Sequence, residues 1–155
     1  MKRIVFVCHG NICRSPMAEM ILRDLLVKRG LTAEVTVASR ATSSEEINGG
    51  EGKPVYPNAR AELEKHGIPC TDKTACQLKR TDADCYDLFV GMDSANIRNM
   101  HRILGFPEGD PRIRRLMDFT PRGGDVSDPW YSRRFDVAYH DIYEGCVALL
   151  DALFD

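Results

Sequence analysis

The first thirty residues contain a short hydrophobic run, a turn and an amphipathic segment. Arg3 to Cys8 (RIVFVC) is rich in β-branched and aromatic residues and too short for a helix, so it predicts a buried strand. Ser15-Pro16 is typical of a helix start, with Ser15 as the capping residue. Gly30 is placed to end this helix, whose apolar face consists of Met17, Met20, Ile21, Leu25 and Leu26.

The pattern after Gly30 predicts three more strands. Glu34–Ser39 alternates between apolar and polar residues, and because a helix separates it from the first run, the two strands form a parallel βαβ unit. Tyr86–Gly91 is typical of a third strand, and Ile113–Phe119 contains a short fourth. The expected fold class is α/β, with a roughly four-stranded parallel sheet and helices on both faces. Further helices are predicted over Asn58–His66, Asp93–Leu104 and Arg134–Phe154.

Two long segments rich in glycine and proline, Ser43–Pro57 and Thr120–Tyr131, are predicted to be loops. In open parallel sheets, ligands bind beyond the carboxyl ends of the strands. The chain leaves the first predicted strand at that edge. The sequence therefore places the candidate site in the loop from Cys8 to Ser15.

Composition narrows the classes of function. The 155-residue chain has 43% hydrophobic and 28% charged residues, typical of one soluble domain, expected to span residues 1–155. A formal net charge of −2 argues against a general nucleic-acid binder. The apolar run from Ile4 to Cys8 is too short for a signal peptide or a membrane span. We therefore expect a cytoplasmic protein without nucleic-acid or membrane partners.

The chain has six cysteines, none of them in a CxxC pair. This spacing does not favour a structural zinc site, so no bound metal is expected. Cytoplasmic thiols are mostly reduced. Outside the loop that follows the first strand, the cysteines are expected to be ordinary buried or half-buried thiols: Cys70, Cys76, Cys85 and Cys146.

The loop after Cys8 has the features of an anion cradle. Backbone N–H groups in such a turn can point inward, and the following helix adds the positive end of its dipole. Gly10 lets a ligand approach the backbone, and Asn11 tolerates a left-handed conformation. Arg14 can hold two oxygens of a phosphate. A thiol at the base of this loop should lose its proton readily, which makes Cys8 a candidate nucleophile toward phosphorus.

The run VCHGNICRSPMAE resembles the signature of the low-molecular-weight protein tyrosine phosphatases, Cys-x5-Arg-Ser followed by Pro and then Ala-Glu. Two more motifs follow in the order typical of that family. Met92-Asp93 with Asn96 resembles its third-strand motif, and Asp128-Pro129-Trp130-Tyr131 resembles its aspartate loop. The resemblance covers nearly the whole chain and implies hydrolysis of phosphotyrosine in protein substrates.

The resemblance also implies catalytic roles. Cys8 attacks phosphorus and forms a phosphocysteine, and Arg14 holds the phosphoryl oxygens with the loop amides. Asp128 protonates the leaving oxygen and then deprotonates water; without the first motif it would be interpreted as a turn-forming residue. No cofactor is expected, because Arg14 and the loop supply the positive charge. The implied phosphate-binding residues are His9, Gly10, Asn11, Ile12, Cys13, Arg14 and Ser15.

The resemblance also implies supporting roles for Ser15, Asn11 and Cys13. Ser15 would donate to the thiolate, and Asn11 would brace the loop together with Ser39. Cys13 would act as a redox partner, because a nearby thiol traps an oxidised Cys8 as a disulfide. The alternative for Cys13 is a small residue that packs under the loop.

The walls of the substrate slot are expected to be apolar. Ile12 offers an apolar wall, and Trp130 and Tyr131 offer an aromatic slot that suits a phenyl ring. The chain departs from the family pattern at Lys73, where a histidine is usual, and at Glu45–Ile47, where many members carry an aromatic residue. These departures affect the expected bracing of the loop and the substrate preference more than the chemistry.

Two other enzymes and two proteins that are not hydrolases share parts of this site. A protein-arginine phosphatase has the same loop but typically carries threonine at the position of Ile12. A thiol-dependent arsenate reductase needs two more cysteines after the third strand, where this chain has Met92 and Asp93. A phosphocysteine carrier needs neither Arg14 nor Asp128, and an inactive phosphate-binding module is expected to have lost at least one residue of the catalytic set.

Overall fold

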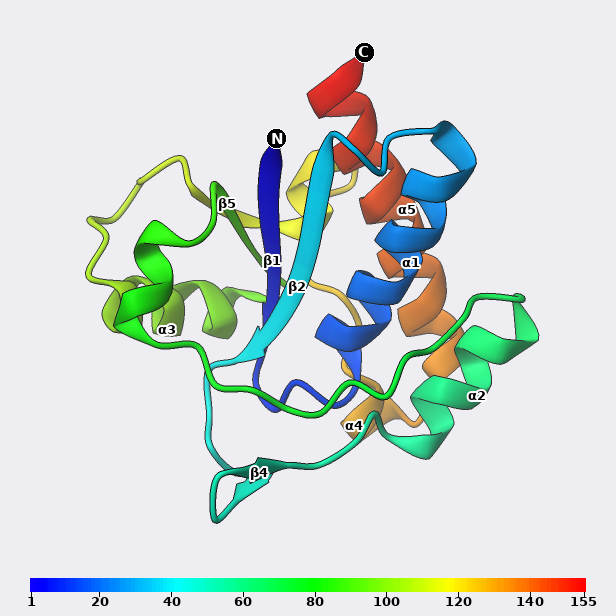
Figure 1. The fold of residues 1–155 in the computed structure, drawn as a ribbon, viewed down its shortest axis with the longest axis horizontal. Coiled ribbons are helices and arrows are strands. Elements are labelled where there is room, and N and C mark those ends of the chain that lie inside the picture. The colour runs from blue at the N-terminus through cyan, green and yellow to red at the C-terminus, as the bar shows by residue number, and fades with distance from the viewer.

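Four parallel strands form the central sheet in the order β2-β1-β5-β6, as predicted for this fold class. The computed structural model describes residues 1–155 (Figure 1). The sheet strands are β1 (Lys2–Cys8), β2 (Val35–Ala41), β5 (Leu88–Gly91) and β6 (Ile113–Arg115). The helices are α1 (Arg14–Arg29), α2 (Pro57–Lys65), α3 (Ser94–Leu104), α4 (Pro129–Ser132) and α5 (Phe135–Phe154), and short 3-10 turns span Arg80–Asp84 and Leu116–Phe119.

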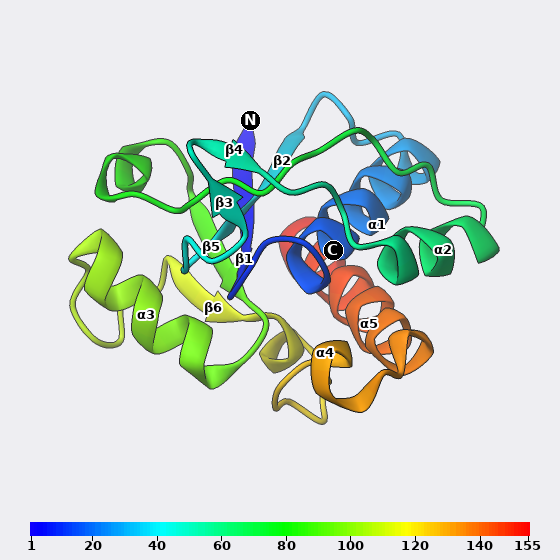
Figure 2. The same ribbon diagram turned by 90° about the horizontal axis from the view of Figure 1, so that it is seen from below.

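Side chains of β1 alternate between two hydrophobic cores, because successive residues of a strand face opposite sides of the sheet. Ile4, Phe6 and Cys8 belong to the larger core, which includes residues of α1 and α5. Val5 and Val7 belong to the smaller core, which includes residues of α3. Figure 2 shows the same division, with α1, α2 and α5 on one side of the sheet and α3 on the other.

Helix α1 connects the first two strands and buries the apolar face that its spacing predicts. Gly30 ends the helix in the left-handed conformation, at φ 68°. The predicted start is wrong by two residues: α1 begins at Arg14, with Cys13 rather than Ser15 in the capping position and no side-chain cap. The Ser15 hydroxyl is not available as a cap because it contacts Cys8 Sγ instead, at 2.9 Å.

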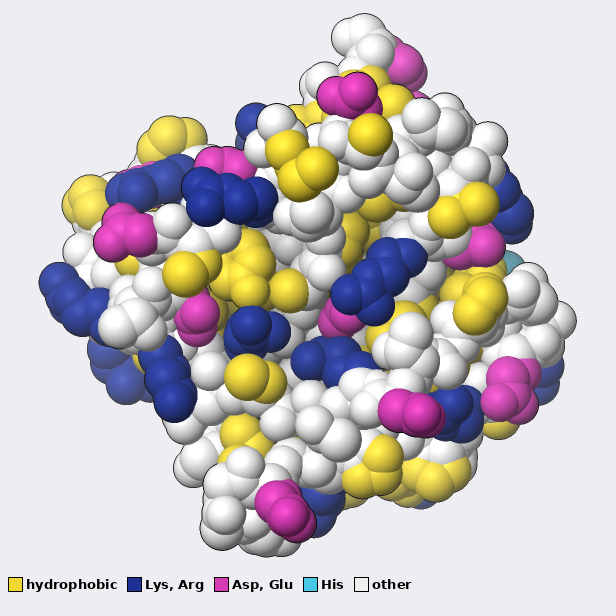
Figure 3. All heavy atoms as spheres, in the orientation of Figure 1, with side chains coloured by type: hydrophobic (Ala, Val, Ile, Leu, Met, Phe, Trp, Pro, Cys, Tyr) yellow, Lys and Arg dark blue, Asp and Glu magenta, His cyan; other side chains and the backbone are white.

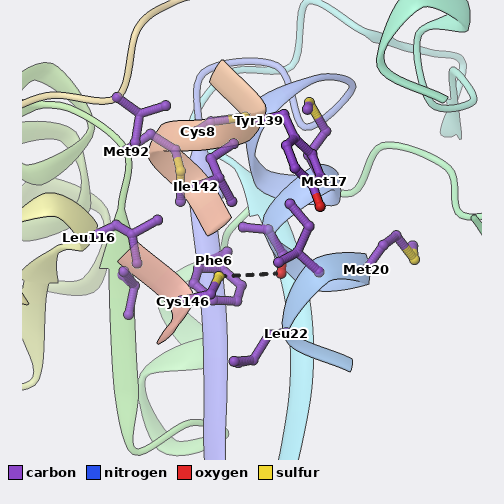
Figure 4. Packing of buried hydrophobic residues seen from close by; sticks show 14 of the residues in the cluster. Phe6, Cys8, Met17, Met20, Leu22, Met92, Leu116, Tyr139, Ile142 and Cys146 are labelled. Carbon is purple, nitrogen blue, oxygen red and sulfur yellow. Dashed lines mark hydrogen bonds between the residues drawn. The ribbon is translucent and has the colours of Figure 1, made fainter. Parts of the chain in front are cut away.

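Helix α5 packs against α1 and closes the larger core (Figure 4). Cys146 lies within this core, and its S–H donates to the carbonyl of Ala18 at 3.9 Å. Burial raises the pKa of the Cys146 thiol. Gly145 allows α5 to approach the 3-10 turn 116–119 closely, since a Cβ there would lie 2.5 Å from Leu116 Cγ.

The structure corrects several sequence predictions outside the sheet. The predicted loop 43–57 contains a hairpin of two short strands, β3 (Ile47–Asn48) and β4 (Glu51–Gly52), and the loop 120–131 contains the start of α4. Gly52 permits the hairpin to approach the chain at Ala75, because a Cβ would lie 1.9 Å from that carbonyl oxygen. Cys76 and Cys85 are exposed rather than buried. Cys85 follows the 3-10 turn 80–84, and Cys76 lies in the extended segment that pairs with Ala41 at the edge of β2. No helix is both long and apolar enough to cross a membrane.

Candidate active site

The loop between β1 and α1 lies at the carboxyl edge of the sheet, where the sequence places the site. In Figure 1 β1 runs downward from the N-terminus, and the loop at its lower end lies near α4 and the β3–β4 hairpin. A cavity of about 410 Å³ opens above the loop. Its walls come from the loop, the 45–46 segment and the start of α4: Cys8, His9, Gly10, Ile12, Cys13, Arg14, Glu45, Glu46, Asp128, Trp130 and Tyr131.

Cys8 forms the base of this cavity and is only 4% exposed. Its sulfur accepts from the Asn11 N–H at 3.3 Å and lies 2.9 Å from the Ser15 hydroxyl. The hydroxyl oxygen of Ser15 itself accepts from the Asn11 side chain at 2.8 Å, which leaves the Ser15 proton free to point at the sulfur. Both contacts stabilise negative charge on Cys8.

Asn11 is the centre of the hydrogen bonds that hold the loop. It adopts a left-handed conformation at φ 59°, which asparagine tolerates better than most residues. Its Nδ2 donates to the hydroxyls of Ser15 and Ser39, the second at 3.0 Å, and its Oδ1 accepts from the backbone N–H of Cys76 at 3.0 Å. The contact with Ser39 agrees with the predicted brace. The contact with Cys76 comes from a segment that the sequence did not connect to the loop.

Arg14 lies at the end of the loop and is 4% exposed. One Nη donates to the Val126 carbonyl at 3.1 Å, and the other lies 2.9 Å from Asp93 and 3.4 Å from Asp128. Burial opposes its charge, but Cys8, Asp128 and Asp93 outweigh that effect and raise the pKa of Arg14. The guanidinium is therefore a fixed cation beside the Cys8 sulfur, and its Nε–H has no acceptor within the protein.

Asp128 is held above the loop by its own turn. Its Oδ1 accepts from the Trp130 N–H at 3.0 Å and so caps α4, while Pro129 occupies the first position of that helix. The segment before it is anchored at two points: the Val126 N–H donates to the Met92 carbonyl, and the Ser127 N–H donates to Asp141. The turn predicted for Asp-Pro is present, and it presents the carboxylate to the cavity.

The aromatic side of the cavity is open to solvent. Trp130 is 48% exposed and Tyr131 is 84% exposed. Tyr56 packs edge-on against Trp130, with ring centroids 5.5 Å apart, and so orients the indole. On the opposite side, where an aromatic residue is missing, the wall carries Glu45 and Glu46.

Cys13 lines the same cavity as Cys8, and both thiols are free. Burial raises the pKa of Cys13 to about 12, and negative charge on Cys8 and Asp128 adds to this effect. Cys13 is therefore a neutral thiol beside the candidate nucleophile. Its role as redox partner stays a prediction.

Three residues of the site were missed or only partly interpreted from the sequence. Asp93 was placed in a motif and at a helix start, but its contact with Arg14 was not predicted. The signal was available, since Asp93 follows β5 and β5 pairs with β1. Tyr56 gave no local signal, because it reaches Trp130 only through the fold. Glu46 was noted only as part of the segment that lacks the family's aromatic residue. Lys73 makes no hydrogen bond to the loop and donates to the Thr74 carbonyl at 3.2 Å.

Together, the sheet order, the anion-binding loop after β1 and the Cys8–Arg14 arrangement define an α/β protein of the phosphate-loop type with a cysteine at the base of the loop. The chain belongs to the low molecular weight phosphotyrosine protein phosphatase family, whose model matches residues 3–154. The fold class and enzyme class predicted from the sequence are thereby confirmed.

Three relatives illustrate how far the similarity extends. The chain is 35% identical to the low molecular weight protein-tyrosine-phosphatase YfkJ of Bacillus subtilis, covering 99% of this chain and 96% of YfkJ. It is 34% identical to PtpA of Staphylococcus aureus, covering 97% of this chain and 93% of PtpA. The crystal structure of YfkJ superposes with a TM-score of 0.89 over 99% of this chain and 94% of that chain. The structure of the Drosophila arginine phosphatase DARP has a TM-score of 0.87 at 28% identity, over 100% and 99% of the two chains.

Proposed function

We propose that the protein hydrolyses phosphotyrosine in protein substrates through a phosphocysteine formed at Cys8. The observation that carries this proposal is the convergence of Cys8, Arg14 and Asp128 on one cavity. A nucleophile, a fixed cation and a carboxylate are the three groups that metal-independent transfer of a phosphoryl group requires. No cluster of three or more histidine, cysteine or acidic side chains that could hold a metal ion is present.

In the first step, the Cys8 sulfur attacks phosphorus as the bond to the tyrosine oxygen breaks. Arg14 and the loop N–H groups hold the non-bridging oxygens, which carry the developing charge. Asp128 gives its proton to the leaving phenolate, so that tyrosine departs neutral. The Asn11 N–H and the Ser15 hydroxyl hold the thiolate in place before it attacks.

In the second step, water attacks phosphorus and the sulfur–phosphorus bond breaks. Asp128, now ionised, takes a proton from that water, and inorganic phosphate leaves as the Cys8 thiolate is regenerated. The contacts of Asn11 and Ser15 with the sulfur stabilise this leaving thiolate. The same groups, a backbone N–H and a hydroxyl, therefore serve both halves of the reaction.

The shape of the cavity favours an aromatic phosphoester. Cys8 lies at its base, and the walls above include Ile12, Trp130 and Tyr131. A phenyl ring can reach the base while its faces contact these apolar side chains. The short aliphatic arm of phosphoserine leaves the aromatic wall without a partner.

Phosphoarginine is the second candidate substrate, because the similar structure of DARP is described as an arginine phosphatase. The experiment is therefore a comparison of phosphotyrosine, phosphoserine and phosphoarginine peptides of one sequence, with a chelator present. We expect phosphotyrosine to be hydrolysed with by far the highest kcat/KM, and the chelator to have no effect. A higher kcat/KM for phosphoarginine would overturn the proposal.

Two variants sharpen this comparison. Ile12→Thr removes an apolar wall and adds a hydroxyl, so it should lower the preference for phosphotyrosine over phosphoarginine. Cys85→Ser changes an exposed cysteine outside the cavity and should leave the preference of the wild-type enzyme unchanged.

A further inference from the structure

A second cavity, of about 440 Å³, lies along the outer edge of β2, between α1 and residues 71–74. We call it the β2-edge cavity. Its basic lining residues come from three separate segments: Arg23 from α1, Arg40 from β2 and Lys73 from the 71–74 segment. Figure 3 shows this face of the molecule, with basic side chains gathered in its middle, over α1 and β2.

The backbone of β2 adds a donor to this cavity. The Lys2 N–H donates to the Glu34 carbonyl, and the Thr42 N–H donates to the Cys8 carbonyl. The backbone N–H and C=O groups of even-numbered residues in β2 therefore point toward β1. The backbone N–H and C=O groups of odd-numbered residues in β2 therefore point toward the outer edge of the sheet. At that edge Ala41 pairs with the 76–78 segment, but the Ser39 N–H has no acceptor within the protein.

Two of the three cations in the cavity form no ion pair. Arg23 lies 2.6 Å from Glu19, which neutralises it. Arg40 donates to the Ser39 carbonyl at 2.8 Å and to a tyrosine hydroxyl, and Lys73 donates only to a neighbouring carbonyl. Neutral acceptors leave both charges uncompensated.

Burial is the main influence on the charge of Lys73, and the charged residues around the cavity act on it in both directions. Burial lowers the pKa of Lys73, and Arg40 and Arg23 lower it further, while Glu19 acts in the opposite direction. Asp72 is the other acidic residue that lines the cavity, and it is exposed at the rim. An anion placed between Arg40 and Lys73 would neutralise both.

We propose that the β2-edge cavity binds a small tetrahedral oxyanion, held by Arg40, Lys73 and the Ser39 N–H, and that Ser39 transmits its occupancy to the phosphate loop. The Ser39 hydroxyl accepts from Asn11 Nδ2 at 3.0 Å and donates to Glu19 at 2.5 Å. Because Asn11 also holds the Ser15 hydroxyl, a shift of Ser39 reaches the Cys8 sulfur through three successive hydrogen bonds. The cavity is thus an effector site separate from the candidate active site.

Inorganic phosphate is the probe, and backbone amide NMR of the full chain measures its binding without relying on turnover. We expect two independent saturable titrations, one in the amides of residues 10–15 and one in those of Ser39 and Lys73. Arg40→Gln with Lys73→Gln should weaken only the second, by about tenfold or more, since it removes two charge-assisted contacts. Lys79→Gln, at an exposed lysine outside the cavity, is the matched control.

Steady-state kinetics test the link to the phosphate loop. Inorganic phosphate competes with substrate at the candidate active site, which changes the apparent KM alone. Occupancy of the β2-edge cavity should add a change in kcat that the Arg40→Gln/Lys73→Gln variant lacks. Shifts of Ser39 and Lys73 that fail to saturate, or that persist unchanged in the double variant, would overturn the site. A kcat effect that is absent, or that survives in the double variant, would overturn the link.

Discussion

Asp128 Oδ2 lies 3.4 Å from Nη2 of Arg14, although the two residues are 114 positions apart in the chain. The carboxylate proposed as the acid is therefore in contact with the cation proposed to hold the phosphoryl group. A bound phosphoryl dianion would replace Asp128 as the partner of the Arg14 guanidinium. Its ester oxygen would then lie near the Asp128 carboxyl group. This pairing explains how the two roles can meet on one substrate.

Replacing Asp128 with alanine should lower kcat for phosphotyrosine by about 10²–10⁴-fold, the usual contribution of a general acid. The loss should be much smaller for aryl phosphates with electron-withdrawing substituents, because their phenolates leave without a proton. The measurement is kcat for wild type and variant across a series of leaving groups. The basic limb of the kcat–pH profile should flatten in the variant.

Asp125→Ala is a suitable control for this series, since Asp125 lies in the same loop but contacts Arg115 and Ser94 outside the cavity. If Asp128 only shapes the Asp-Pro turn, its loss would lower kcat for all substrates by the same factor. A uniform loss across the series would therefore reject the acid role, however large the loss.

Arg14→Lys should lower kcat/KM by about 10²–10³-fold, because an ammonium group cannot replace the planar grip of a guanidinium on two oxygens. The variant also loses at least one of the contacts to Asp93 and Val126 that fix the side chain. Kinetics with phosphotyrosine peptide measure the effect, and Arg112→Lys on the surface provides the comparison. Activity within a few-fold of wild type would exclude Arg14 as the phosphate clamp.

Peroxide should inactivate the enzyme reversibly if Cys13 is the redox partner. Oxidation converts the Cys8 thiolate to sulfenic acid, and attack by the Cys13 sulfur then forms a disulfide and releases water. This oxidation removes negative charge from Cys8, one of the causes that raise the pKa of Cys13. Recovery with a thiol reductant should be slower or incomplete in Cys13→Ser. Equal recovery in both proteins would leave Cys13 with a packing role only.

Cys13 should also affect stability at alkaline pH. Its pKa is about 12 in the folded protein against an ordinary value of 9.0, so above pH 9 the unfolded chain loses a proton that the folded chain keeps. This contribution to stability is fully present below pH 9 and is lost as the pH rises toward 12. Between these values, Cys13→Ser should flatten the decline in unfolding free energy by about 1.4 kcal/mol per pH unit.

Urea denaturation at pH 8, 9 and 10 measures this slope. The exposed Cys85→Ser serves as the control and should follow the wild type. If plots of unfolding free energy against pH are parallel for Cys13→Ser and wild type, then Cys13 ionises alike in the folded and unfolded states.

Local patterns were sufficient to predict much of the fold and the centre of the site. The run from Arg3 to Cys8 predicted β1, and its alternation accounts for the two cores on either side of the sheet. The spacing of Cys8 and Arg14 within one loop predicted their convergence, because only five residues of turn separate them. Asp128 could be assigned only from its Asp-Pro-aromatic motif, since its contact with Arg14 depends on the whole fold.

Apart from the brace between Asn11 and Ser39, contacts within the site that depend on the path of the backbone were not predicted by local patterns. The Cys76 N–H braces Asn11 through its backbone, so no side-chain pattern marks it. Ser15 was expected to cap the helix because capping is the commonest use of serine at that position. The structure uses its hydroxyl on Cys8 instead, a contact that the family resemblance predicted and the local pattern did not.

Direct detection of the phosphocysteine is the measurement that tests the central claim. The Asp128→Ala variant should hydrolyse the intermediate slowly, because the same carboxylate activates water. Rapid quenching after mixing with phosphotyrosine peptide, followed by tryptic digestion, yields one peptide of residues 4–14 that contains both Cys8 and Cys13. Fragment-ion mass spectrometry should place one phosphoryl group on Cys8. A phosphoryl group on another residue, or none during measurable turnover, would contradict the account.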